Sequence, residues 1–335
     1  TMPNYNGVWS LSTQYQYVAD WPLSPTTILA AGVVLFGGDN NTSAIDKITL
    51  INTAAATDFG DLSVSGRENG AAVGSSTRAV FAGGSESDNP GEVIDFVTFA
   101  SEGNATDFGN LSDGKQDFGS ASNNTRGLFM AGTTGSRINV VDYITIASEG
   151  NATDFGDCSA TKTDLHGCAS TTRAVVGGGN TGSRINVIDY FTIGSTGNST
   201  DFGNLTASRS GVGSASSSTR GVFAGGYDGS TPQVNTIDYI TLDSAGNASD
   251  FGDLTAQLQP RTSCGSNSIK AVFLMGDNKL DVITLASTGN AADFGGAVMT
   301  AASATGVGGA SNAHGGVVTG LMQLILFQEV YLLVV

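Results

Sequence analysis

Residues 235–254 read NTIDYITLDSAGNASDFGDL, and the phrase recurs along the chain with small changes. Its most regular part is the tripeptide Asp-Phe-Gly, of which six copies follow one another at steps of 49, 47, 47, 49 and 43 residues. A seventh copy at 117–119 lies outside this series, and the name Asp-Phe-Gly is kept below for the six regular copies. A period in the forties that carries short, β-branched phrases is typical of β-propeller blades, which are small four-stranded sheets around an axis. The repeat therefore predicts an all-β protein whose blades form one domain, although 335 residues would otherwise suggest two or three.

The unit at residues 209–254 predicts four strands. They are a small-residue strand at 211–217, a second strand at 220–225 that ends in Gly-Gly, an alternating third strand at 236–242, and a fourth strand at 249–254. Small residues suit the innermost strand, where blades crowd the axis, and the Gly-Gly pair suits a tight exit. We expect each sheet to be covered on both faces by its neighbours.

Two side chains recur at fixed positions of the unit. The phenylalanine of each Asp-Phe-Gly is expected to be a wedge between blades that contributes roughly 2–3 kcal/mol through burial. An aspartate on the third strand, 12 residues before each Asp-Phe-Gly aspartate, is expected to make the same internal hydrogen bond in every blade. The phenylalanines are Phe59, Phe108, Phe155, Phe202, Phe251 and Phe294; the aspartates are Asp46, Asp95, Asp142, Asp189, Asp238 and Asp281; their expected partners are Arg78, Arg126, Arg173, Arg220 and Lys270. Six copies argue against the kinase magnesium motif, whose glycine-rich and catalytic loops are missing from the sequence.

The ends of the chain predict seven blades. The phrase GGVVTG at 315–320 resembles a seventh second-strand phrase, and Asp20–Leu23 resembles a degenerate outer-strand phrase. We therefore expect a seventh blade that closes the ring with strands from both termini, which would leave no open sheet edge. Residues 20–335 would form the propeller, and residues 1–19 a lead-in segment.

Two terminal segments do not follow the repeat. Residues 7–17 are compatible with a closing strand or with a short helix. The apolar tail at 321–335 is too short for a membrane span, which needs about 20 residues. We expect the tail to be a buried strand of the closing blade, with a contact to another subunit, and hence a homo-oligomer, as the alternative.

The pattern of an arginine, Val-Phe-Ala-Gly-Gly, then Ile-Asp-Tyr and an aromatic before a leucine resembles the Kelch repeat, with phenylalanine in the tryptophan position. The GNATDFGDL-type phrases, and the opening Met2–Gln16 followed by Trp21-Pro22, are similar to virion and tail-fibre proteins of marine bacteriophages. The resemblance implies a Kelch-like propeller that is a structural or host-recognition part of a phage particle. Its partners would be other virion proteins.

Composition disfavours several functions. The formal net charge of −16 disfavours binding to nucleic acid or anionic lipid. Cys158, Cys168 and Cys264 form no CxxC pair and are interpreted as small core residues. His166 and His314 are interpreted as polar fillings of inner strands rather than as a shared metal site. No catalytic residue, metal ligand, cofactor or signal peptide is predicted.

The candidate binding residues lie where repeat length varies. Between second and third strands the spacing changes from blade to blade, whereas the rest of the frame is nearly constant. Loops on a rigid frame commonly form binding surfaces, and neutral drift is the alternative explanation. The loops span 85–92, 133–139, 180–186 and 227–235, and their candidate ligand-binding residues are Glu86, Asp88, Arg137, Arg184, Tyr227 and Asp228.

We therefore expect a non-enzymatic component of a phage tail fibre or surface appendage whose loops bind a host-surface glycan or protein. A decoration or assembly protein that binds only other virion subunits is the first alternative. An enzyme acting on surface polysaccharide is the second, and the lack of a clustered acid/base pair in the sequence disfavours it.

Overall fold

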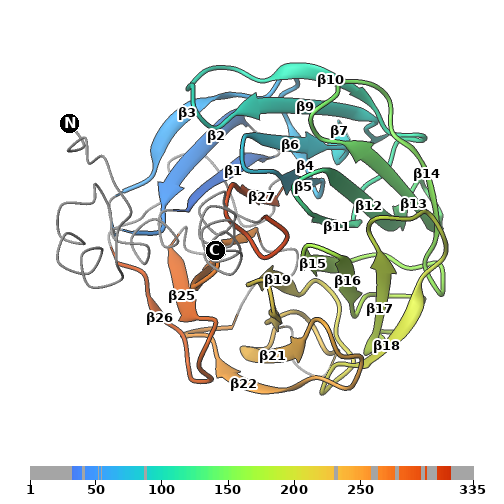
Figure 1. Ribbon diagram of the computed structural model, residues 1–335, viewed down its shortest axis with the longest axis vertical. Helices are drawn as coiled ribbons and strands as arrows, with labels where there is room; N and C mark the ends of the chain where they lie inside the picture. Colours follow the sequence, from blue (N-terminus) through green and yellow to red (C-terminus); the bar gives the residue numbers. More distant parts are fainter. Residues whose placement is uncertain are drawn as a thin grey trace, which may run out of the picture.

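The computed structural model describes residues 32–39, 42–51, 53, 55–86, 89–229, 233–257, 263–275, 279–295, 299 and 308–317. Over these ranges the chain forms six four-stranded antiparallel sheets that surround a central axis as the blades of a β-propeller (Figure 1). The predicted propeller of four-stranded blades is confirmed, and the predicted number of seven blades is wrong.

Blades 2 to 6 run in chain order from an inner strand to an outer strand. Blade 2 contains β5 (Ala71–Gly74), β6 (Arg78–Ala82), β9 (Val93–Thr98) and β10 (Thr106–Asn110); blade 3 contains β11 (Gly119–Ser122), β12 (Arg126–Thr133), β13 (Arg137–Thr145) and β14 (Thr153–Asp157). Blade 4 contains β15 (His166–Ala169), β16 (Arg173–Gly177), β17 (Val187–Thr192) and β18 (Thr200–Asn204); blade 5 contains β19 (Gly213–Ser216), β20 (Arg220–Ala224), β21 (Thr236–Thr241) and β22 (Ser249–Asp253). Blade 6 contains β23 (Cys264–Ser266), β24 (Lys270–Leu274), β25 (Leu280–Thr284) and β26 (Ala292–Asp293). The strands predicted from residues 209–254 therefore lie within one or two residues of those observed in blade 5.

Blade 1 closes the ring with strands from two distant parts of the chain. Its second, third and outer strands are β1 (Val33–Asp39), β2 (Thr42–Thr49) and β3 (Thr57–Asp61), and its inner strand is β27 (Gly308–Ser311). β27 pairs antiparallel with β1, with Leu35 opposite Ala310 (Figure 1).

This closure explains the error in the number of blades. Among the described residues, the inner strand beside β1 is β27, which completes blade 1 instead of beginning a seventh blade. The Gly-Gly pair at 315–316 follows β27 in a turn and belongs to no second strand. The segments 20–23, 7–17 and 321–335, to which the sequence analysis assigned closing roles, lie outside the described residues.

The hydrophobic core is divided among the blade interfaces. Six clusters of buried residues each combine side chains from two neighbouring blades, including the pair formed by blades 6 and 1. The six Asp-Phe-Gly phenylalanines belong to these clusters and are only 2–3% exposed, so the predicted wedge is confirmed. In blades 2 to 5 the phenylalanine also meets an aromatic ring of the third strand edge to face, with the centroids of Tyr143 and Phe155 5.7 Å apart.

The Asp-Phe-Gly glycine allows the outer strand of one blade to touch the next blade. Gly156 has φ 144°, and a Cβ there would collide with the carbonyl oxygen of Gly197 in blade 4. The same turn donates the Gly197 N–H to the Phe155 carbonyl at 2.7 Å, and Asn198 Oδ1 accepts the Asp157 N–H at 3.1 Å. The Gly-Asn and Asp-Phe-Gly phrases recur together because they form the two halves of this contact.

In blades 2 to 6, the basic residue that begins the second strand also bridges two blades. Arg126 lies over the ring of Tyr143 at 4.9 Å and donates to the Ile193 carbonyl of blade 4 at 2.9 Å. The corresponding contact of Lys270 with the Leu50 carbonyl, at 3.3 Å, joins blade 6 to blade 1. These residues therefore bind the following blade, and the prediction that they pair with the third-strand aspartates is wrong.

Candidate binding face and axial channel

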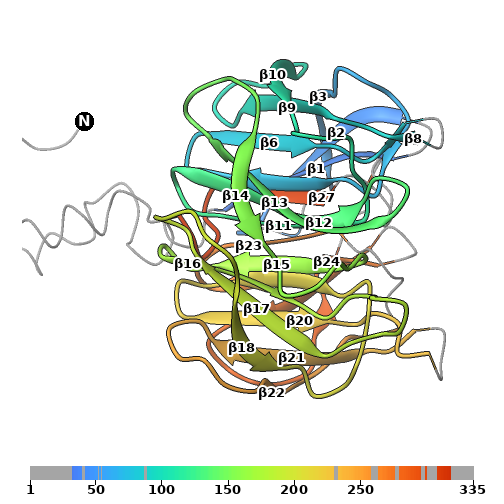
Figure 2. The same cartoon turned by 90° about the vertical axis from the view of Figure 1, so that its right-hand side faces the viewer.

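The order of strands places all connections between second and third strands on one face of the ring, which we call the loop face. The inner strand begins and the outer strand ends at the same face, because all four strands of a blade run antiparallel between the two faces (Figure 2). The opposite face, which we call the turn face, carries the short turns between inner and second strands. The four loops predicted to vary are therefore neighbours on the loop face.

Arginines join the loops of blades 3, 4 and 5. Arg137 is exposed, and its Nη2 lies 3.5 Å from Asn180 Oδ1 in the next loop. One blade further, the guanidinium of Arg184 lies over the ring of Tyr227, 3.7 Å from the centroid. The two contacts use equivalent positions, because Arg137 and Arg184 are 47 residues apart and so are Asn180 and Tyr227. We call Arg137, Asn180, Arg184 and Tyr227 the arginine arc.

Of the other three candidate loop residues, Glu86 and Asp228 lie within the described ranges. Glu86 belongs to β7 (Ser85–Glu86), which forms a small sheet with β4 (Arg67–Glu68) and β8 (Asn89–Pro90). Asp88 lies outside the described residues. Asp228 is half-buried beside Tyr227. The structure therefore brings Arg184, Tyr227 and Asp228 together and connects them through Asn180 to Arg137.

The third-strand aspartates of blades 2 to 5 are buried in ion pairs. Asp189 Oδ2 lies 2.6 Å from Lys162 Nζ and accepts a hydrogen bond from Ser159 Oγ at 2.8 Å. The pairs are Arg67–Asp95 at 2.7 Å, Lys115–Asp142 at 2.8 Å, Lys162–Asp189 at 2.6 Å and Arg209–Asp238 at 2.7 Å. Burial lowers the pKa of the Lys115 ammonium, and the adjacent Asp142 carboxylate opposes that shift. The aspartates are structural, as expected, but their partners belong to the segments that connect blades.

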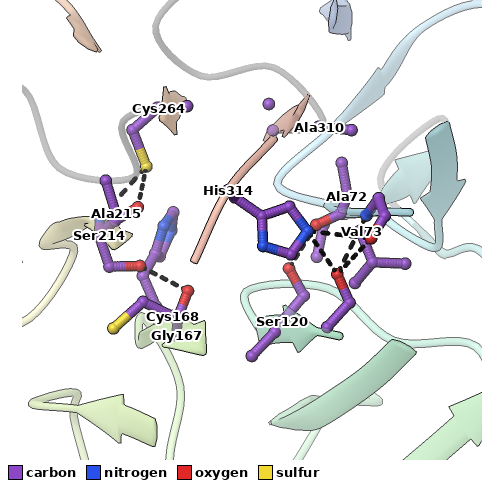
Figure 3. A pocket seen from close by; sticks show the side chains of 18 of the residues that line it. Ala72, Val73, Ser120, Gly167, Cys168, Ser214, Ala215, Cys264, Ala310 and His314 are labelled. Atoms are coloured by element: carbon purple, nitrogen blue, oxygen red, sulfur yellow. Dashed lines mark hydrogen bonds between the residues drawn. The ribbon is translucent and has the colours of Figure 1, made fainter. Parts of the chain in front are cut away.

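An axial channel of about 80 Å³ runs between the six inner strands. Alanine, glycine and serine dominate its wall, which Figure 3 shows at Ala72, Ser120, Ser214 and Ala310. Serine hydroxyls join adjacent inner strands: Ser120 Oγ donates to the Ala72 carbonyl at 2.8 Å, and Ser214 Oγ donates to the Gly167 carbonyl at 2.7 Å. Small residues are required here because all six blades converge at the axis.

Residues 312–317 cross the channel at the turn face, and we call them the axial plug. Gly315 donates its N–H to the Ser216 carbonyl of blade 5 at 3.1 Å. The ring of His314 points toward the inner strands of blades 2 and 3, where Nε2 lies 2.9 Å from the Gly74 carbonyl and 3.2 Å from Ser122 Oγ (Figure 3). Nδ1 accepts the Gly316 N–H at 3.1 Å. Burial lowers the pKa of His314 below its ordinary value of 6.5.

The other end of the channel, at the loop face, begins with a ring of polar residues. Asn69, Asp117 and Asp164 occupy equivalent positions ahead of successive inner strands, and together with His166 they line a hollow of about 10 Å³. We call these four residues the mouth ring. Of these four residues, only His166 was predicted to lie on an inner strand. The other three recur at steps of 48 and 47 residues, each two residues after a buried cation, and this recurrence marks them in the sequence.

The remaining candidate groups are the three cysteines. Cys158, Cys168 and Cys264 are buried, as predicted, and burial raises the pKa of Cys158 and Cys264 to about 12. Among the described residues, no group of three His, Cys, Asp or Glu side chains could hold a metal ion. Within the same ranges, no helix is long and apolar enough to cross a membrane.

No family model matches this sequence, and no curated protein is significantly similar to it. The class of protein is therefore defined by the fold alone: a six-bladed β-propeller with small four-stranded antiparallel blades.

Proposed function

We propose that this protein is a non-enzymatic recognition component of a bacteriophage particle, in a tail fibre or surface appendage. The phage assignment rests on the similarity of the repeat phrase and the opening segment to marine phage virion proteins. Its partners in the particle are other virion proteins.

The ligand-binding surface is the arginine arc, and the ligand is a host-surface glycan or protein that carries carboxylate, sulfate or phosphate groups. The observation that carries this proposal is the stacking of Arg184 on Tyr227 together with the exposed Arg137 one blade away. A planar guanidinium can donate two parallel hydrogen bonds to such an anion. In a chain of net charge −16, two neighbouring loop arginines provide a local site for anions that the rest of the surface repels.

The test compares the wild-type protein with Arg137→Gln and Arg184→Gln on an array of acidic and neutral bacterial glycans and on host-surface proteins. We expect each substitution to weaken binding to an acidic ligand by about tenfold or more, because a hydrogen bond to a charged group is lost. Lys47→Gln is the matched control, since it removes one positive charge from β2, outside the loops.

Other results would contradict the proposal in distinct ways. Tight binding to capsid or tail subunits, with no binding to host glycans or proteins, would instead favour a decoration or assembly protein. Release of shorter saccharides from a polysaccharide would favour an enzyme. Unchanged affinity in both arginine variants would exclude the arginine arc as the binding surface.

A further inference from the structure

We propose that the mouth ring binds a primary ammonium group, such as the end of a lysine side chain, at the loop-face end of the axial channel. This site is separate from the arginine arc and has the opposite charge preference. It does not depend on the function proposed above.

Three residues of the mouth ring share an unusual backbone conformation. Asn69, Asp117 and Asp164 all have left-handed backbone angles, with φ of 58°, 57° and 57°, and Gly211 fills the equivalent position in blade 5 with φ 66°. Glycine adopts this conformation without strain, whereas other residues adopt it at a cost. Asparagine and aspartate tolerate it best among residues with a side chain, so three blades keep a polar group where glycine would suffice.

The backbone fixes these side chains in an arc around the axis. The N–H of Asp117 donates to the Asn69 carbonyl at 2.8 Å, that of Asp164 to the Asp117 carbonyl at 2.9 Å, and that of Gly211 to the Asp164 carbonyl at 2.7 Å. Each bond joins two neighbouring blades, so the ring is part of the frame rather than of a free loop.

The mouth ring contains an unsatisfied hydrogen-bond acceptor. Asn69 is 9% exposed, and its buried Oδ1 has no hydrogen-bond partner among the described residues. A buried acceptor without a donor is costly, so a group that donates hydrogen bonds is favoured in the hollow that Asn69 lines. The two aspartates of the ring add negative charge, which selects a cationic donor over a neutral one.

Size and charge select among cations. A hollow of about 10 Å³ holds one water-sized group, which matches an ammonium head and is too small for a guanidinium. An ammonium head donates three hydrogen bonds, and one of them would satisfy Asn69 Oδ1. The two carboxylates, one of which already accepts the Thr163 hydroxyl at Asp164 Oδ2 (3.0 Å), attract the head through their charge. A bound metal is disfavoured, because the described acids and histidines form no group of three that could hold one. The aliphatic stem of the ligand would extend toward the loop face.

The test is a calorimetric titration of the full-length protein with n-butylammonium chloride at constant ionic strength, at about pH 8, where an ordinary imidazole is neutral. We expect saturable binding of n-butylammonium and none of n-butanol, which has no charge, or of tetramethylammonium, which has no N–H. Saturable binding of tetramethylammonium with equal affinity would overturn the proposal, because it would show attraction by charge alone. Absence of saturable n-butylammonium binding would also overturn it.

The variants Asn69→Gly, Asp117→Gly and Asp164→Gly keep the backbone conformation that Gly211 already adopts in blade 5. We expect each to weaken n-butylammonium binding by about tenfold, the value of a hydrogen bond to a charged group. Asp154→Asn on the outer strand makes the same charge change away from the channel and is expected to leave binding unchanged. Equal affinity of the glycine variants and the wild type would overturn the proposal. Arg137→Gln should bind n-butylammonium normally, which separates this site from the arginine arc.

Discussion

At the scale of single residues, the third-strand aspartate ties each blade to the segment that enters it. Asp189 on β17 forms an ion pair with Lys162 and accepts a hydrogen bond from the Ser159 hydroxyl. Both partners belong to the connection that leaves blade 3. Both charged side chains of this pair are fully buried. A buried pair of this kind contributes little net stability compared with apolar residues, but its partners become interdependent.

Asp189→Ala should therefore destabilise the protein strongly. It leaves the Lys162 ammonium buried without its counter-charge, and we expect the free energy of unfolding to fall by about 3–5 kcal/mol. Denaturant unfolding followed by circular dichroism measures this loss. The double variant Lys162→Met/Asp189→Leu should recover most of it, and the exposed Asp154→Asn should change stability by less than about 0.5 kcal/mol. A single variant as stable as the wild type would contradict the structural role of the aspartate.

The sequence predicted the structural role of this aspartate but assigned it the wrong partner. Arg173 was the obvious candidate because an arginine recurs at its position in four units, yet its guanidinium donates to the Leu242 carbonyl of blade 5. The actual partner, Lys162, alternates with arginine at equivalent positions, as at Arg209. The recurrence of a positive charge at this position, as either lysine or arginine, could have identified the partner from the sequence.

At the scale of secondary-structure elements, the outer strand and the turn between third and outer strands form one interlocking contact. The bulge at Asp-Phe-Gly turns the phenylalanine into the interface and brings the glycine against the turn of the next blade. The contact recurs with nearly the same geometry, since the Asp-Phe-Gly glycines of blades 1 to 5 have φ between 143° and 148°. The phrase and the wedge could be predicted from the sequence, but the close approach of two glycines from different blades is visible only in three dimensions.

Gly156→Ala should weaken this contact. A methyl group at this position would collide with the Gly197 carbonyl, and φ 144° is strained for any residue with a side chain. We expect a loss of at least about 2 kcal/mol in the free energy of unfolding, measured by denaturant titration. Gly194→Ala is the matched control, because nothing lies within 4 Å of its added methyl group. Similar losses in the two variants would show that the inter-blade contact carries no special weight.

At the scale of the whole molecule, stability depends on closing the ring. Each of the six hydrophobic clusters requires two neighbouring blades, so no blade has a complete core of its own. Closure uses β27 as the inner strand of blade 1 and the Lys270 contact between blades 6 and 1. The pairing of β27 with β1 joins residues 34–37 to residues 308–311, and closure therefore requires both ends of the propeller.

The number of blades was the feature least accessible from sequence. The repeated phrase GSAS at 119–122 and 213–216 has a relative, GGAS, at 308–311, and the first repeat lacks this phrase. Counting inner-strand phrases would have indicated six blades. The phrase GGVVTG at 315–320 suggested a seventh, because it resembles the second-strand phrases of the repeat. The mouth ring was also not predicted, because its residues are far apart in the sequence and line one hollow only when the blades converge on the axis.

The axial plug links the stability of the whole ring to pH. The Gly316 N–H must donate to His314 Nδ1, so the ring proton resides on Nε2 and points to the Gly74 carbonyl. Protonation of Nδ1 would remove this acceptor and place a positive charge at the turn-face end of the channel, where the described wall residues include no Asp or Glu. Burial accordingly lowers the pKa of His314, so the unfolded chain takes up a proton at a higher pH than the folded protein.

The sign of the pH effect follows from linkage, since stability falls wherever the unfolded state binds more protons as the pH decreases. As the pH falls below the ordinary value of 6.5, His314 should reduce the free energy of unfolding, with a slope approaching about 1.4 kcal/mol per pH unit, until the folded protein also becomes protonated. Denaturant unfolding between about pH 5 and 7.5 measures this slope. His314→Gln should have a shallower slope, whatever its absolute stability, because glutamine does not titrate and His166 is present in both proteins. Parallel slopes for the two proteins would show that the axial plug does not sense pH through His314.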